Sequence, residues 1–431
     1  MIKKIVLSIL SAASFYAVST VTLFAVSGGA HAESSDTKSV KVPAMRNRVY
    51  TQLARAQQLA DEGTKLEGFE VLDDVKDRID SLNSYEKAML WNFYGFMYYG
   101  NDDLDSAIDS FEHVIAEQAI PESLRLSTLY SLAQLSLQQE DYDAGIKHLK
   151  VWQQLNSKPM TAQQYMVFAQ AFYQNKDYKQ SLNYNNKAVE LAFALNEIPK
   201  ENWLVLQRAN YYELKKPLEV VKVIENLVRY YNKPNYWIQL SGMYGEVGEE
   251  DKQLAVMESA LQAGYVTKSN DILTLVQLYL YHGVPFKAAT LLSESIEQGH
   301  VVAEVRYLDM LAQAYIAANN DDKAIPVLKE AAKIADSGKF DAYLAQAYLN
   351  TEKWSLAYDA AETAITRGGL TRLGDMHLVK GMASYNLAQF ERSLMAFTQA
   401  QKQPETAKTA KQWFHYVERE QGVKNKLAML N

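Results

Sequence analysis

The sequence predicts an all-α chain built from repeated pairs of helices. Apolar residues recur at helical spacing, short polar breaks divide them, and the whole pattern returns along the chain. In one copy, a first helix is expected over Trp91–Tyr98 and a second over Leu104–Val114, after the polar break Asn101–Asp103. Gly95 in the first helix and Ala107 in the second are small, so the two helices can cross closely.

Nine copies are found when each is anchored on the small residue of its first helix, which we call the small position. The small positions are Gly95, Ala133, Ala169, Ala209, Ser241, Val276, Ala312, Ala345 and Gly381. Successive gaps are 38, 36, 40, 32, 35, 36, 33 and 36 residues, as expected for a repeat of about 34 residues with short loop insertions. Most copies have an aromatic residue three places later and a small residue twelve places later, so each column has a packing role.

This pattern resembles the tetratricopeptide repeat, W-x2-L-G-x2-Y…A-x3-F. The resemblance implies a right-handed superhelical solenoid of about nine to ten helix pairs, whose first helices line a concave groove. The array is expected over residues 44–404, with clear repeats from about residue 88. Residues 44–82 are interpreted as a degenerate first repeat, because Gly63 and Gly68 interrupt it.

The last segment, residues 405–431, is expected to form a capping helix and tail. Trp413, Phe414 and Val417 can cover the last repeat, while charged residues of the same helix face water. A solenoid needs such a cap because its terminal unit lacks one neighbour.

The first 32 residues are expected to be a signal peptide, followed by a flexible linker over 33–43. Lys3 and Lys4 precede an apolar run, and Ala30-His31-Ala32 fits the small-x-small cleavage pattern. The alternative is an uncleaved anchor helix, because the apolar run approaches the length that spans a membrane.

Charge and cysteine content exclude several classes of function. Removal of Lys3 and Lys4 leaves 42 basic against 51 acidic residues, a net charge of −9. This balance argues against nucleic acid and anionic membrane surfaces as partners, and no stable membrane insertion of the mature chain is expected. The chain has no cysteine, which excludes a lipoprotein anchor, disulfides, thiolate metal sites and cysteine nucleophiles.

No constellation of catalytic residues is found, so neither an enzyme nor a cofactor is expected. The phosphate loop, H-E-x-x-H and G-x-S-x-G are all absent. One set of oxygen ligands matches positions 1, 3, 5, 9 and 12 of an EF-hand calcium loop: Asn101, Asp103, Asp105, Asp109 and Glu112. Ser106 stands where that loop requires glycine, so an aspartate that caps a helix start is favoured and no metal site is predicted.

The candidate site is the groove that the resemblance implies. The residues directly after the small positions are expected to face it: Phe96, Gln134, Gln170, Asn210, Gly242, Gln277, Gln313, Gln346 and Met382. Six of these nine carry carboxamides, which can pair with an extended peptide backbone because each offers donors and an acceptor. Tyr99, Tyr173 and Tyr385, three residues further on, would flank the bound side chains. The alternative is that glutamine is simply a good exposed helix former.

A narrower resemblance involves Val42–Gly63 and Gly381–Lys402. Both segments are similar to exported tetratricopeptide proteins of Gram-negative bacteria that accompany TonB–ExbB–ExbD energy-transduction sets. The resemblance implies a periplasmic scaffold that binds a protein or peptide, with TonB, ExbB or ExbD among the possible partners, and serves outer-membrane transport of iron or haem. The alternative is an assembly factor for envelope secretion, pilus or polysaccharide-export machinery.

Export can be tested directly. We expect the mature chain to begin at Glu33 and to be released by osmotic shock, because the cleavage pattern ends at Ala32. N-terminal sequencing of the released protein gives the answer. Recovery from inner membranes alone, with Met1 still present, would contradict the prediction.

Overall fold

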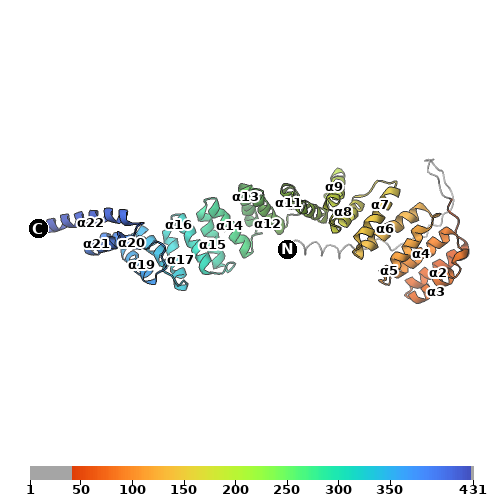
Figure 1. The fold of residues 1–431 in the computed structure, drawn as a ribbon, viewed down its shortest axis with the longest axis horizontal. Coiled ribbons are helices and arrows are strands. Elements are labelled where there is room, and N and C mark those ends of the chain that lie inside the picture. The colour runs from red at the N-terminus through yellow and green to blue at the C-terminus, as the bar shows by residue number, and fades with distance from the viewer. Residues whose placement is uncertain (1–40, 429–431) are drawn as a thin grey trace. The chain divides into compact units, whose positions relative to one another are not determined.

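The computed structural model describes residues 41–428 of the chain, and side chains as far as residue 425. The predicted signal peptide and the first part of the linker lie outside this range. The described residues form helices and connecting turns, without a strand, and divide into two compact units, the first ending at Asn232 and the second beginning at Lys233. The predicted all-α architecture of repeated helix pairs is confirmed (Figure 1).

The first unit, as far as Asn232, contains five helix pairs in chain order. Their bounds are α2 Asn47–Asp61 and α3 Lys65–Lys76, α4 Ser84–Tyr99 and α5 Leu104–Ala116, α6 Glu122–Gln138 and α7 Tyr142–Leu155, α8 Ala162–Gln174 and α9 Tyr178–Ala194, α10 Glu201–Glu213 and α11 Pro217–Tyr231. A short 3-10 helix, η2 Ile79–Ser81, connects the first pair to the second.

The second unit, from Lys233, contains five further pairs and a final single helix. Their bounds are α12 Pro234–Glu246 and α13 Glu250–Gln262, α14 Ser269–Tyr281 and α15 Pro285–Glu297, α16 Val305–Ala317 and α17 Asp321–Ile334, α18 Lys339–Asn350 and α19 Trp354–Arg367, α20 Leu373–Asn386 and α21 Phe390–Ala400, and α22 Ala407–Ala428. None of the helices from α2 to α22 is long and apolar enough to cross a membrane.

Every pair in the described range uses the same turn between its two helices. In α16–α17, Asn319 has φ 53° and the Asn320 N–H donates to the Tyr315 carbonyl at 2.9 Å. Counted from the small position Ala312, Tyr315 lies three places later, Asn319 seven and Asn320 eight. The left-handed residues of the ten turns are Gly63, Asp102, Glu140, Lys176, Lys215, Gly248, Gly283, Asn319, Glu352 and Ala388. Such a turn satisfies a carbonyl that the end of the first helix leaves without a helical partner.

The turn identifies the small position of each pair, because that residue lies seven places before the left-handed residue. This rule corrects one assignment. In α10–α11 the left-handed residue is Lys215, and the Lys216 N–H donates to the Tyr211 carbonyl at 2.9 Å. The small position of this pair is therefore Arg208, and the assignment to Ala209 is wrong by one residue. Tyr212, expected to wedge between helices, is accordingly 50% exposed.

The turn also corrects the description of the first pair. The Thr64 N–H donates to the Leu59 carbonyl, which makes Ala56 the small position. Gly63 has φ 92° and forms the left-handed turn, while Gly68 is buried inside α3 at the helix crossing. The two glycines therefore do not interrupt the repeat but occupy its regular positions.

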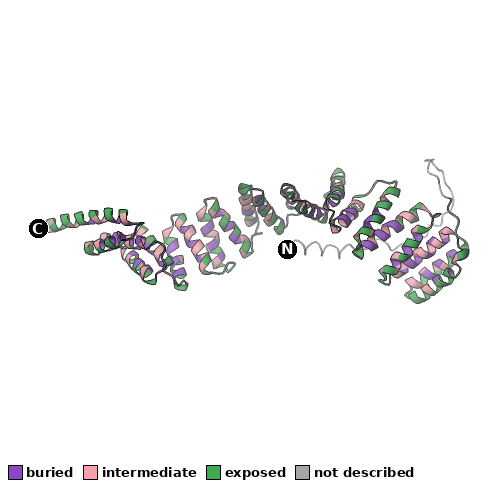
Figure 2. Cartoon of the chain, viewed as in Figure 1, coloured by how far each residue is buried: buried purple, intermediate pink, exposed green. Residues whose placement is uncertain are grey.

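The helices of a pair cross closely at the small position. The eight predicted small positions that agree with the turn geometry are all buried, and a methyl group added at Gly95 would lie 2.6 Å from the Phe111 ring. Gly381 and Phe397 repeat this geometry at the end of the array, also at 2.6 Å. Figure 2 shows buried residues on the facing sides of the helices and exposed residues on their outer sides.

Helix α22 packs on α21 and covers the last pair, at the place where the capping helix is expected. Val417 is buried, and the Trp413 ring stacks on Phe397 at 5.8 Å between centroids. Phe414 is half-buried.

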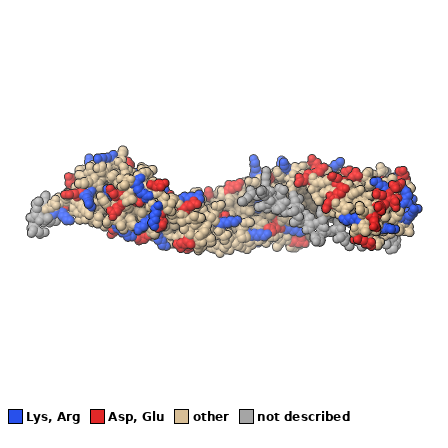
Figure 3. Space-filling model, turned by 90° about the horizontal axis from the view of Figure 1, so that it is seen from below, with Lys and Arg blue, Asp and Glu red and all other residues tan. Residues whose placement is uncertain are grey.

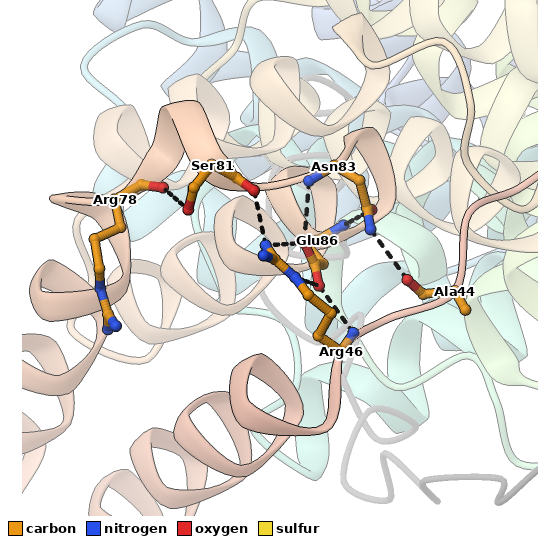
Figure 4. Close-up of polar contacts among 6 residues, drawn as sticks. All are labelled: Ala44, Arg46, Arg78, Ser81, Asn83 and Glu86. Carbon is orange, nitrogen blue, oxygen red and sulfur yellow. Dashed lines mark hydrogen bonds and ion pairs between the residues drawn. The ribbon is translucent and has the colours of Figure 1, made fainter.

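The other end of the array is closed by a polar cluster (Figure 4). The buried Glu86 carboxylate accepts from the Arg46 backbone at 2.8 Å, from the Arg46 guanidinium at 2.7 Å and from the Asn83 N–H at 3.0 Å. Asn83 also donates from its side chain to the Ala44 carbonyl at 3.0 Å. The cluster joins the chain before α2 to the start of α4. Hydrogen bonding to Arg46 lowers the pKa of Glu86 to about 2.

Alanine substitutions at glycine test the close crossing. Gly95→Ala and Gly381→Ala should each cost about 1–3 kcal/mol, because the added methyl group overlaps a phenylalanine ring. Gly242→Ala should instead stabilise by about 0.5–1 kcal/mol, since nothing lies within 4 Å of the added group and alanine favours a helix. Urea unfolding of the full chain measures all three. Equal effects at Gly95 and Gly242 would contradict the crossing.

Glu86→Gln tests the polar cluster. At pH 7 it should cost about 1–3 kcal/mol, because the carboxylate loses charged hydrogen bonds. The folded-state pKa is lowered, so the wild-type advantage is complete above the ordinary pKa of 4.5 and is lost as pH falls towards about 2. Amide exchange in α2 across this pH range is the measurement, with the exposed Glu112→Gln as control. A constant difference between Glu86→Gln and wild type from pH 7 to pH 2 would be the contrary result.

Candidate functional site

The candidate site is a face of the first helices, which we define by the residues one and four places after each small position. We call it the amide face. Its members are mostly half-buried or exposed although the small positions beside them are buried. A helix explains this contrast, because a step of one residue rotates the side chain about 100° from the helix crossing towards solvent.

The second unit carries the clearest run of amides. Gln277 and Gln346 are exposed and Gln313 is half-buried, each on a successive first helix. Gln277 and Gln313 make no side-chain hydrogen bond to the residues that the structure describes, whereas Gln346 donates to the Asn350 side chain at 2.9 Å. The half-buried Leu280, Ile316 and Leu349 lie four places after the small positions and form an apolar column beside the amides.

The first unit carries a shorter run of amides, with an aromatic side chain beside it. Gln134 and Gln170 are half-buried and have no side-chain hydrogen bond within the described part of the chain. Tyr173 is half-buried beside them, and burial raises its pKa to about 12. The hydroxyl therefore stays protonated and can act as a neutral hydrogen-bond donor.

Phe96 and Tyr99 occupy the equivalent positions in α4. Phe96 is half-buried and packs edge-on against Phe111 at 5.2 Å between centroids, so it contributes to the helix crossing as well as to the face. Tyr99 is half-buried.

Asn210 is not part of the amide face. It is fully buried, and neither side-chain atom has a hydrogen-bond partner in the described residues, so its assignment to the groove is wrong. The one-residue shift in α10 places Ala209 and Tyr212 at the equivalent positions. Sequence reasoning also missed Gln57, which follows Ala56 in α2 and is half-buried. The one-residue shift in α10 could have been found from Pro217, the first residue of α11. Pro285 is the first residue of α15 and lies nine places after Val276, and nine places before Pro217 is Arg208 rather than Ala209.

The cap occupies the amide face of the last pair. The Tyr385 hydroxyl pairs with the Tyr416 hydroxyl of α22 at 3.0 Å, and this hydrogen bond raises the pKa of Tyr385 to about 12. Trp413 packs edge-on against the same ring at 6.2 Å between centroids. Met382, one place after Gly381, is half-buried.

Acidic side chains are concentrated in the N-terminal part of the first unit. Residues 44–117 hold fifteen of the 51 acidic residues but only seven of the 44 basic ones. Figure 3 shows carboxylates crowded over this N-terminal part on the face drawn. The amide and apolar columns at Gln277, Gln313 and Gln346 are themselves uncharged, so hydrogen bonding and apolar contact are the interactions they offer.

The set of residues weighed as a calcium loop forms a helix start instead. Asp103 caps α5 by accepting from the Ser106 N–H at 3.1 Å, as the capping alternative predicts. Asp109 and Glu112 lie within α5 itself. Among residues 41–425, no group of His, Asp or Glu side chains is placed to hold a metal ion.

Residues 305–337, which span α16 and α17, match the family model of the tetratricopeptide repeat. These residues form a tetratricopeptide repeat. The shared turn and crossing extend the helix-pair arrangement of this stretch to all ten pairs that the structure describes. No curated protein matches the sequence significantly.

The chain also resembles parts of several solved tetratricopeptide structures. The P58(IPK) TPR domain is 15% identical, with 79% of this chain and 99% of that chain covered and a TM-score of 0.24. The TPR2AB domain of yeast Sti1, solved as a pHSP90 complex, is 14% identical, covering 60% and 98% at a TM-score of 0.28. YrrB, described as a TPR protein with an unusual peptide-binding site, is 13% identical, covering 43% and 94% at a TM-score of 0.35. These low scores carry no information about the partner of this chain.

Proposed function

We propose that this protein is a non-catalytic scaffold that binds an extended segment of a partner protein on its amide face. The observation that carries the proposal is the run of Gln277, Gln313 and Gln346 on successive first helices, with Leu280, Ile316 and Leu349 beside it. An extended chain presents N–H and C=O groups at regular intervals, and each carboxamide can donate and accept. The apolar column then offers contacts to the side chains of the same segment.

The proposal includes where the protein acts. The predicted signal peptide and the resemblance of Val42–Gly63 and Gly381–Lys402 support a periplasmic location. The same resemblance supports a role beside a TonB–ExbB–ExbD set, in outer-membrane transport of iron or haem. Crosslinking in intact cells, followed by identification of the crosslinked peptides, tests this role. Recovery of secretion, pilus or polysaccharide-export components instead of TonB, ExbB or ExbD would favour the assembly-factor alternative.

The amide face can be tested with a triple variant. Replacing Gln277, Gln313 and Gln346 with alanine should weaken binding of the crosslinked partner segment at least tenfold, since each lost pair costs about 0.5–1.5 kcal/mol. Helicity should persist because alanine is the better helix former. Titration of the partner segment, with circular dichroism of each variant, gives both quantities.

A matched control uses glutamines outside the amide face. Gln262, Gln298 and Gln399 are exposed and lie on α13, at the end of α15 and on α21. Their replacement by alanine should leave affinity unchanged. If the amide-face variant binds as tightly as this control and as wild type, its glutamines are ordinary solvated helix surface.

A further inference from the structure

A row of aromatic side chains joins α3, α4 and α5 in the first unit, and we call it the aromatic row. It runs from Phe69 through Tyr98, Tyr94 and Trp91 to His113, and the centroids of neighbouring rings lie 4.9, 5.9, 5.5 and 4.3 Å apart. Tyr94 is buried, while Phe69, Tyr98 and Trp91 are half-buried. The row therefore presents part of its aromatic surface to solvent on a side of α4 that the amide face does not use.

One end of the aromatic row already holds a cation. The Lys76 ammonium lies 5.2 Å from the centroid of the Trp91 ring and 5.4 Å from that of Tyr94. Within residues 41–425 this ammonium forms no ion pair with a carboxylate, so the two rings are the groups that attract it. The contact shows that the row is a surface on which a positive charge is stable.

The other end of the aromatic row, at Tyr98, is surrounded by carboxylates. Burial raises the pKa of Tyr98, and the negative charges of Asp73, Asp103 and Asp109 raise it further, so all three lie close to the ring. Asp73 and Asp103 accept hydrogen bonds from neutral groups only, which leave their charges in place. No lysine or arginine of the described range forms an ion pair with these three carboxylates, and Asp109 lies 3.8 Å from the imidazole of His113.

The two second helices beside the aromatic row carry the same sign of charge. Residues 65–77 and 104–117 contain nine acidic residues and two basic ones, and eight of the nine acidic residues are exposed. Like charges one helical turn apart repel each other, as at Asp73 and Asp77 on α3. Charge complementarity therefore selects a positively charged occupant for this surface.

The spread of the carboxylates favours an organic cation over a metal ion. Among residues 41–425, no three His, Asp or Glu side chains converge closely enough to hold a metal ion. A guanidinium is larger and planar and carries five N–H donors, so it can lie against an aromatic ring and reach carboxylates on either side of it.

We propose that the Tyr98 end of the aromatic row docks an arginine side chain of a partner protein. The guanidinium lies against the exposed part of the Tyr98 ring and donates to Asp73 of α3 and to Asp109 of α5. This surface goes beyond the proposed function, because it does not involve the amide run on α14, α16 and α18.

The absence of cysteine from the chain allows the surface to be probed with tethered peptides. Leu66 is 82% exposed and lies about one and two turns before Phe69 and Asp73 on the same side of α3, so Leu66→Cys places a thiol beside the Tyr98 end. The probes are Cys-Gly-Arg-Gly, Cys-Gly-Lys-Gly and Cys-Gly-citrulline-Gly, each acetylated and amidated. Citrulline keeps the shape of arginine without its charge. Capture by disulfide exchange is measured by mass spectrometry of the intact protein.

We expect about fivefold greater capture of the arginine peptide than of the citrulline peptide at Leu66→Cys, because two exposed ion pairs supply this discrimination. The arginine peptide should exceed the lysine peptide about twofold, since a guanidinium packs better on an aromatic ring. Adding Asp73→Asn and Asp109→Asn should remove the preference over citrulline. Adding Glu67→Gln and Asp74→Asn, which removes as much charge from another side of α3, should leave it unchanged.

Gln58→Cys controls for general attraction to an acidic surface, because it lies on α2 beside Glu62 and away from the aromatic row. Equal capture of the arginine and citrulline peptides at Leu66→Cys would overturn the proposal. So would a preference that is as large at Gln58→Cys, or one that survives the changes at Asp73 and Asp109. Equal capture of the arginine and lysine peptides would show unspecific attraction of cations and would also overturn it.

The same assay separates this proposal from the amide face. The arginine preference at Leu66→Cys should survive alanine at Gln277, Gln313 and Gln346, since those side chains lie in the second unit. Loss of the preference in that triple variant would contradict an independent surface.

Discussion

The fold depends on one contact that is repeated along the chain: the close crossing of a first and a second helix at the small position. At two repeats the crossing brings a side chain of the second helix to the backbone of the first. Ser181 donates to the Ala169 carbonyl at 2.7 Å and Ser393 donates to the Gly381 carbonyl at 2.8 Å, both twelve residues apart. Larger residues at these places would separate the helices and remove the contacts on either side.

The crossing and its turn also decide which residues are left for function. Once the small position is buried, helical geometry turns the residue one place later towards solvent. This is why Gln277, Gln313 and Gln346 recur on one face without contributing to the core. The ends of the array are closed by different means. Helix α22 covers Tyr385, while the buried Glu86, paired with the exposed Arg46, joins the incoming chain to α4.

Much of the fold could be predicted because its information is local. The columns of small and aromatic residues specify each pair, and eight of the nine predicted small positions agree with the turn geometry. The repeat register of α10–α11 was predicted one residue too late, because Ala209 is the small residue of that segment. The turn shows that Arg208 occupies the equivalent position. A search for small residues cannot find an arginine there. Asn210 shows the consequence for the site, since one residue of register moves a side chain from a solvent face into the core.

Other features could not be predicted because they depend on contacts between distant residues. The Glu86 cluster joins side chains 40 residues apart and leaves no periodic signal in the sequence. The proposed partner-binding role of the amides also belongs to this class, because glutamine on a solvated helix has the same pattern with or without a ligand.

Cysteine crosslinking tests the repeated crossing most directly, since the natural chain has no cysteine. Ala169→Cys with Ser181→Cys places two thiols at a crossing where the Ser181 hydroxyl already reaches the Ala169 backbone. The account predicts that mild oxidation forms this disulfide fully and without loss of helicity, whereas Gln170→Cys with Leu182→Cys, displaced by one residue, remains reduced. Crosslinking of the displaced pair, with none at residues 169 and 181, would contradict the account.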